Sequence, residues 1–229
     1  MPKTSIVQIY QNYQVPPNLQ QHMLRVGAVG KLALDHWQGE KIDKQHILDA
    51  LLVHDMGNLI KFELDKQQSK KMLKTTKKTK ASTKNWKKIQ QQMIERYGSN
   101  ADRANELIAQ ELSLHQRTQK LLMHHSFERL VEIAPENHWE EKLVFWADLR
   151  IAPQGLVSAE ARIQDLKDRY EHRDERWADS SLYNLWLKTA ITIERQLNQR
   201  TSINLQEITQ QDLEPIVEQL TAYQLEIEV

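Results

Sequence analysis

Four side chains combine metal-ligating chemistry with positions that should be buried. His22, His54 and Asp148 each fall on the apolar side of a different predicted helix, and Asp55 adjoins His54. Burying two carboxylates is costly unless they are paired or bound to a metal. One divalent ion would neutralise both carboxylates and leave coordination positions open for water and substrate. This pattern predicts a metal site built from His and Asp.

Each of these residues also has a purely structural interpretation. A single histidine on an apolar helix face is more often a hydrogen-bonded core residue than a ligand. A single aspartate near a helix end is usually a cap.

The chain has no cysteine, so disulfides, thiolate catalysis and cysteine-ligated metals are excluded. Any metal must bind through His, Asp, Glu or Asn.

Helices are expected to position these side chains, because helical spacing of apolar residues recurs and strand-like alternation is nearly absent. Pro16 and Pro17 suit a helix start, and Gly39 a stop. Asp43 and Asn100 are predicted N-caps. The fold class is therefore all-α, a bundle of about eight to ten segments. The longer helices are predicted at about 17–38, 43–55, 101–112, 117–127, 139–149, 158–173, 181–199 and 212–225.

The adjacent pair His54-Asp55 and its surroundings resemble the HD-domain superfamily of metal-dependent phosphohydrolases. That family carries a His, then a His-Asp pair, then a distant Asp, all on helices. Here the matching stretches are LQQHMLRV around His22, ALLVHDMGN around the pair and FWADLR around Asp148. The resemblance covers residues 15–170. It implies an HD-domain helical bundle over residues 1–175, with extra C-terminal helices over residues 176–229 packed on it.

The resemblance also implies an activity. The protein is expected to be a metal-dependent phosphohydrolase acting on a nucleotide or other small phosphorylated metabolite. One divalent ion, which would be Mn, Fe, Co, Zn or Ni, is expected on His22, His54, Asp55 and Asp148. The metal would bind a phosphate oxygen and activate a water that attacks phosphorus. Asp55 or Asp148 would orient that water as a catalytic residue. Phosphomonoesterase and phosphodiesterase activity are not distinguished.

Three cations lie close in sequence to the expected ligands and are candidates for binding substrate phosphate. Arg25 follows His22 by three residues and shares its helix face. Lys61 follows the His-Asp pair, and Arg150 lies two residues after Asp148. Charge that develops on phosphoryl oxygens needs such cations nearby. The alternative for each is a solvated surface charge.

Two further histidines, His124 and His125, resemble the paired histidines of the superfamily branches that hold two metals. Those branches also carry a histidine at the start of the preceding helix, and residues 97–100 contain none. We therefore expect one tightly held metal. His124 or His125 would line the pocket or ligate a second metal, and a core histidine is the alternative.

A lysine-rich insertion spans Lys66 to Lys88, with ten lysines and no acidic residue. Such a block is usually solvated. It would attract polyanionic substrates, or nucleic acid, if it lay over the pocket. Its single aromatic residue, Trp86, is fewer than single-strand nucleic-acid platforms usually carry. A solvated loop with no specific role is the alternative.

Two other function classes compete with the enzyme. One is an HD scaffold that senses a nucleotide without turnover, and the other is a nucleic-acid-associated protein that uses the lysine-rich insertion.

Residues 157–170 carry charges expected mainly as pairs on a helix surface. With no apolar run long enough for a membrane helix and no signal-peptide core at the N-terminus, the expected location is cytoplasmic, with no membrane contact. The oligomeric state is not indicated.

Overall fold

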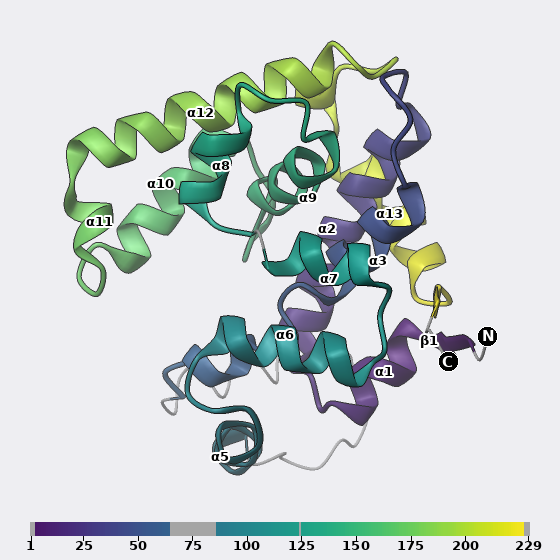
Figure 1. The fold of residues 1–229 in the computed structure, drawn as a ribbon, viewed down its shortest axis with the longest axis vertical. Helices are drawn as coiled ribbons and strands as arrows, with labels where there is room; N and C mark the ends of the chain where they lie inside the picture. The colour runs from purple at the N-terminus through teal and green to yellow at the C-terminus, as the bar shows by residue number, and fades with distance from the viewer. Residues whose placement is uncertain (1–2, 65–85, 124, 227–229) are drawn as a thin grey trace.

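The computed structural model describes residues 3–64, 86–123 and 125–226 of the chain (Figure 1). The predicted all-α class is confirmed, because helices account for most of these residues and the strands form two short antiparallel pairs. Most of the lysine-rich insertion, and His124, lie outside the described residues. In chain order the helices are α1 (Ile6–Asn12), α2 (Pro17–Asp35), α3 (Lys44–Val53), η1 (Asn58–Lys61), α5 (Trp86–Tyr97), α6 (Ala101–Glu111), α7 (Gln116–Met123), α8 (Phe127–Ile133), α9 (Trp139–Leu149), α10 (Ala159–Tyr170), α11 (Glu175–Ala178), α12 (Ser180–Asn198), η2 (Leu205–Glu207) and α13 (Gln210–Leu220).

Local sequence signals set several helix starts. Pro17 is the first residue of α2, where its missing N–H costs nothing. The Asp43 side chain accepts a hydrogen bond from the backbone N–H of His46 at 3.3 Å and caps α3. Asn100 caps α6 through the N–H of Arg103 at 2.9 Å. These three predicted starts are confirmed.

A central group of helices carries the expected ligands. α2 packs against α3, α9 and α13, and α3 also packs against α7 and α9. α9 is buried on every side, with Leu143, Val144, Trp146 and Ala147 at most 1% exposed. His22, His54 and Asp148 thus come from helices, or helix ends, that contact one another directly.

Two outer groups flank this centre. The long helix α12 runs over α8, α9 and α10 on one side (Figure 1). On the other side, α6 packs against η1, α5 and α7. In the described ranges no helix is both long and apolar enough to cross a membrane.

The two ends of the described chain lie side by side (Figure 1). Strand β1 (Lys3–Ser5) pairs antiparallel with β4 (Gln224–Glu226), so that Thr4 faces Leu225. A second pair, β2 (Ile151–Ala152) with β3 (Gly155–Leu156), forms a tight hairpin directly after α9. Neither pair was expected, because strands this short contain too few residues to show alternation.

Several helices were also not predicted, among them the short helices α11 and η2. α1 and α5 lie in segments without a recognised start signal. The predicted helix over residues 117–127 is two helices, because α7 ends at Met123 and α8 begins at Phe127. Ser126 caps α8 by accepting a hydrogen bond from the N–H of Arg129 at 3.2 Å. The break directs His125 and Phe127 toward the same interior as Asp148.

Candidate metal centre

Three of the predicted ligands converge. The Nε2 atoms of His22 and His54 lie 3.3 Å apart. Asp148 Oδ1 lies 3.0 Å from His22 Nε2 and 3.5 Å from His54 Nε2. Among the described residues, this is the group of His, Cys, Asp and Glu side chains whose donor atoms all lie within 4.8 Å of one another.

These separations suit a first-row divalent ion. Metal–ligand bonds of about 2.0–2.2 Å place neighbouring donors about 3.0–3.5 Å apart. Asp148 Oδ1 is buried and lacks a hydrogen bond of acceptable geometry, although two imidazole nitrogens face it. A buried carboxylate oxygen that makes no well-directed hydrogen bond is costly, and a cation between it and the imidazole nitrogens would satisfy it. The residues present therefore fit a metal ion.

The hydrogen bonding of His54 leaves its outer nitrogen available. His54 follows the last residue of α3, and its Nδ1 lies 2.8 Å from the carbonyl oxygen of Leu51. A carbonyl can only accept, so Nδ1–H is the donor and Nε2 points to the centre. Fixing the tautomer in this way is typical of metal-ligating histidines.

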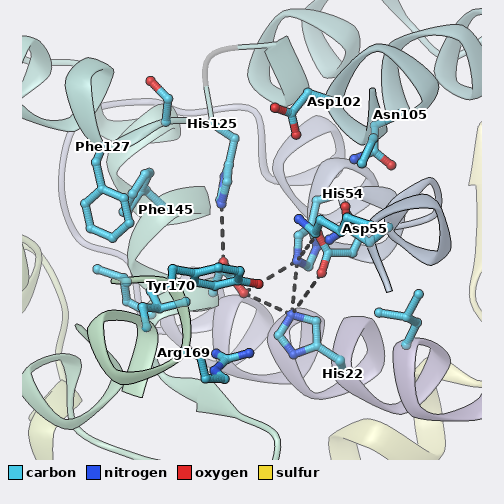
Figure 2. A pocket seen from close by; sticks show the side chains of 18 of the residues that line it. His22, His54, Asp55, Asp102, Asn105, His125, Phe127, Phe145, Arg169 and Tyr170 are labelled. Carbon is cyan, nitrogen blue, oxygen red and sulfur yellow. Dashed lines mark hydrogen bonds and ion pairs between the residues drawn. The ribbon is translucent and has the colours of Figure 1, made fainter. Parts of the chain in front are cut away.

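The fourth predicted ligand, Asp55, flanks the three converging groups. Its carboxylate oxygens lie 3.6 Å from His22 Nε2 and 3.8 Å from His54 Nε2. Figure 2 shows Asp55 beside His54, at the same end of the cavity as His22. Asp55 can complete a four-residue ligand set, or hold a water molecule beside the metal.

The carboxylates hold positive charge strongly at this centre. Burial alone would lower the pKa of His54, but Asp55 and Asp148 outweigh burial and raise that pKa to about 9. Burial would raise the pKa of Asp148, but His125, His22 and His54 offset burial and hold it well below its usual value. A site that stabilises imidazolium and carboxylate charges so closely is also suited to a divalent cation.

A close helix contact fixes the turn that carries Asp55. Gly57 lies so near α6 that a Cβ there would be 2.8 Å from Ala104 Cβ and 2.9 Å from the Ala101 carbonyl oxygen. The Gly57 N–H donates to Asn105 Oδ1 at 2.6 Å. Glycine is therefore required at this position by space, and Asn105 anchors the turn from the neighbouring helix.

A cavity of about 800 Å³ opens from the centre, which is a typical size for a small-molecule site. Aromatic side chains form one wall. Phe127 packs edge-on against Phe145 and Trp177, with ring centroids 5.1 Å apart in both pairs. The cavity also contains side chains of both charges; they are Arg25, Asp55, Lys61, Asp102, Glu106, Asp148, Arg162, Arg169, Asp174 and Arg176.

Buried polar atoms without a hydrogen-bond partner gather on the cavity wall. In the described part of the chain, five side chains that line the cavity have such an atom. They are Asn18, Asn58, His125, Asp148 and Arg162. Since folded proteins pair nearly all buried polar groups, this concentration is typical of a ligand-binding surface.

Two of the three predicted substrate cations reach the cavity. Arg25 and Lys61 both line it. Lys61 also helps to lower the pKa of Asp55, after His54, against the effect of burial. Both cations therefore line the same cavity as the candidate ligands, and their contact with a substrate phosphate stays a prediction.

The third predicted cation, Arg150, does not reach the cavity. Its side chain is only 4% exposed and forms an ion pair with Glu194 of α12, with 3.3 Å between Nη1 and Oε2. It also donates to the carbonyl oxygens of Val157 and Leu205. Arg150 is the residue directly after α9, and the turn into the β2–β3 hairpin directs its side chain away from Asp148.

His125 lies where a pocket residue was expected. Its Nε2 is 3.4 Å from Asp148 Oδ2, and its ring stacks on Phe145 at 4.9 Å. Figure 2 shows it entering the cavity opposite His22. His125 contacts Asp148, but it is not a member of the converging donor group, which consists of His22, His54 and Asp148.

Two cavity residues were expected mainly as surface charges. Arg162 and Arg169 both line the cavity from α10. The segment was recognised as a charged helix, but a face directed to a pocket cannot be distinguished from a solvated face by spacing alone. A signal was present, however, because Leu166 and Tyr170 continue the same face at helical spacing.

Neither a protein-family description, nor a curated protein, nor a solved structure matches this chain.

Proposed function

We propose that the protein is an HD-like metal-dependent phosphohydrolase that acts on a nucleotide or another small phosphorylated metabolite. The observation that carries the proposal is the convergence of His22, His54 and Asp148 at the end of a cavity that Arg25 and Lys61 also line. In particular, Asp148 Oδ1 lies buried between the imidazoles of His22 and His54 and makes no hydrogen bond of acceptable geometry. The resemblance of the His, His-Asp and Asp stretches to the HD superfamily supports the same conclusion.

The residues divide into three roles: metal ligands, a residue that orients water, and residues that bind the substrate. His22, His54 and Asp148, with Asp55 beside them, would hold one divalent ion. A divalent ion bound there supplies a Lewis acid for a phosphate oxygen and lowers the pKa of a water molecule. A second metal would need ligands beyond this group, and His125 is the candidate nearest to Asp148.

Asp55 is suited to orient the attacking water. Its pKa is lowered from the usual value, chiefly by His54, with further effects of Lys61 and His22 against burial. It therefore remains a carboxylate at neutral pH and accepts a hydrogen bond from water. Held by the Gly57 turn, it would direct the water oxygen toward phosphorus.

The cavity walls are suited to the rest of the substrate. Arg25 and Lys61 would offset the charge that develops on the phosphoryl oxygens. Phe127, Phe145 and Trp177 offer an aromatic wall for an organic group such as a nucleobase. This division between cationic and aromatic walls supports a phosphorylated organic metabolite over inorganic phosphate alone.

Phosphate release from a panel of nucleotides and phosphorylated metabolites tests the proposal. The metal-stripped protein is resupplied with manganese, cobalt, iron or zinc. The proposal predicts metal-dependent release that Asp55→Ala abolishes. Asp35→Ala, which changes an exposed carboxylate on the same helix as His22, serves as the control and should leave release intact. Stoichiometric metal binding with no release from any compound would favour a sensing scaffold instead.

A further inference from the structure

One face of α10 lines the cavity with two arginines. Arg162, Leu166, Arg169 and Tyr170 are spaced at four, three and one residues and all line the cavity. That spacing places them on a single side of the helix. Helix α10 is held in place by contacts with α9 and α12, so this face is part of the packed structure.

A single carboxylate holds both guanidinium groups. Asp165 Oδ2 accepts from Arg162 Nη1 at 2.8 Å and from Arg169 Nη2 at 2.6 Å. One carboxylate cannot neutralise two guanidiniums, so the trio carries an excess positive charge. Asp165 also holds the two side chains together and limits their rotamers, which prepares them for a shared ligand.

Arg162 retains an unused donor. Its side chain is 9% exposed, and its Nε is buried without a hydrogen-bond partner. A guanidinium presents its donors in a planar fork that matches phosphate and carboxylate oxygens. An anion in the cavity would accept from this Nε, and the buried donor would then be satisfied.

A further arginine of the cavity, Arg176 of α11, differs from the pair. Arg176 also lines the cavity, but it pairs with Asp174 and Glu128. Its charge is therefore offset by two carboxylates of its own. Arg162 and Arg169 share one carboxylate, so they are a better anion site than Arg176.

We propose that Arg162 and Arg169 form a second anion-binding subsite, which selects a phosphorylated substrate that carries a second anionic group. This inference rests on the proposed function, because the first anionic group is the phosphate at the candidate metal centre. The second group is a phosphate or carboxylate that the paired guanidiniums bind. A substrate with a single phosphate would leave Arg162 Nε without a partner.

Non-hydrolysable phosphonates test the subsite. Binding of n-propylphosphonate is compared by calorimetry with ethane-1,2-, propane-1,3- and butane-1,4-diphosphonate. We expect one of the diphosphonates to bind about tenfold more tightly than the monophosphonate, as for an added charge-assisted hydrogen bond. Arg169→Gln and Arg162→Gln should remove that preference and leave the monophosphonate affinity within about twofold. Each titration is repeated on metal-stripped protein, so that chelation of the metal by the probe is separated from binding to the arginines.

Matched variants keep the result interpretable. Arg176→Gln changes an arginine of the same cavity whose charge is already offset, and it should preserve the diphosphonate preference. Arg162 is buried, so its variant is checked by thermal unfolding. Arg169 is 38% exposed and carries the test if Arg162→Gln does not fold.

The two proposals fail in different ways. A diphosphonate preference that persists in Arg169→Gln, or the absence of any preference in the wild-type protein, overturns the subsite. Phosphate release without an arginine-dependent preference leaves the proposed function intact and removes the subsite. An arginine-dependent preference without phosphate release from any compound supports the subsite and contradicts the proposed function.

Discussion

Protonation of His54 links pH to metal binding. Asp55 and Asp148 raise the pKa of this histidine to about 9, so the metal-free protein holds a proton at neutral pH where a metal would bind. We predict that metal binding at pH 7 releases a proton and that metal affinity increases between about pH 7 and 9. Calorimetry in buffers of different ionisation enthalpy measures the proton release. His172→Ala, which alters an exposed histidine, should behave like the wild type, and pH-independent affinity would contradict the prediction.

The same proton affects the stability of the metal-free protein. The folded-state pKa of about 9 exceeds the ordinary histidine value of 6.5. The protonated imidazole therefore contributes its full stabilisation below about pH 6.5, and this contribution is lost as the pH increases through about 9. Metal-free protein should unfold at a lower temperature at pH 9 than at pH 6.5, whereas saturating metal should reduce that difference.

The buried pair of Arg150 and Glu194 gives a third prediction about single residues. Their side chains are 4% and 5% exposed, and Glu194 also accepts from Trp146 Nε1 at 2.9 Å. Glu194→Ala leaves a buried guanidinium without its charge partner, and we expect a loss of about 3–5 kcal/mol in the free energy of unfolding. Chemical denaturation measures it.

An exposed ion pair provides the control for that prediction. Arg173 and Glu63 lie closer together, at 2.8 Å, but are 51% and 66% exposed. Glu63→Ala should therefore cost less than about 1 kcal/mol, because solvent screens the pair. Equal losses in Glu194→Ala and Glu63→Ala would show that Arg150 is not held by a structural charge pair.

Among the elements, the contact between η1 and α6 determines the position of the turn with Asp55. Gly57 has a φ of −83°, which any residue can adopt, so only space requires glycine there. Gly57→Ala should cost about 1–3 kcal/mol, because backbone atoms of α6 must move. It should also weaken metal-dependent phosphate release through displacement of Asp55.

Gly27 of α2 is the matched control. A Cβ at Gly27 would meet side-chain atoms of Leu52 at 2.8 Å and of Leu220 at 3.3 Å, with no backbone atom among the nearest contacts. Those side chains can adjust, and alanine gains about 0.5–1 kcal/mol over glycine in a helix interior. Gly27→Ala should thus unfold near the wild-type midpoint. If Gly57→Ala were equally neutral, the turn would not depend on close packing against α6.

Considered as a whole molecule, the protein was most predictable where local signals act. Apolar periodicity and the caps at Asp43 and Asn100 located α3 and α6. The apolar faces of α2 and α3 predicted that His22 and His54 point inward. The short strands β1 and β4 could not be predicted, because their pairing joins residues about 220 positions apart and no local pattern records it.

The candidate site was predictable for a related reason. A buried carboxylate or imidazole on an apolar helix face stands out in the sequence. For a cation just after the C-terminal end of a helix, the sequence does not reveal where the side chain points. Arg150 lies two residues from Asp148, yet the turn after α9 directs it to Glu194. Arg162 and Arg169 reach the cavity only through the packing of α10 against α9 and α12, which spacing alone does not encode.

Titration of metal-stripped protein with manganese, by calorimetry and thermal unfolding, tests the metal centre most directly. The wild type should bind one ion per chain, and an ion at about a thousand times its Kd should add about 4 kcal/mol to the free energy of unfolding. Asp148→Asn preserves the side-chain volume but removes the carboxylate, and it should lose both the binding and the stabilisation. Equal manganese affinity in the wild type and Asp148→Asn, or no binding in either, would contradict a metal centre at His22, His54 and Asp148.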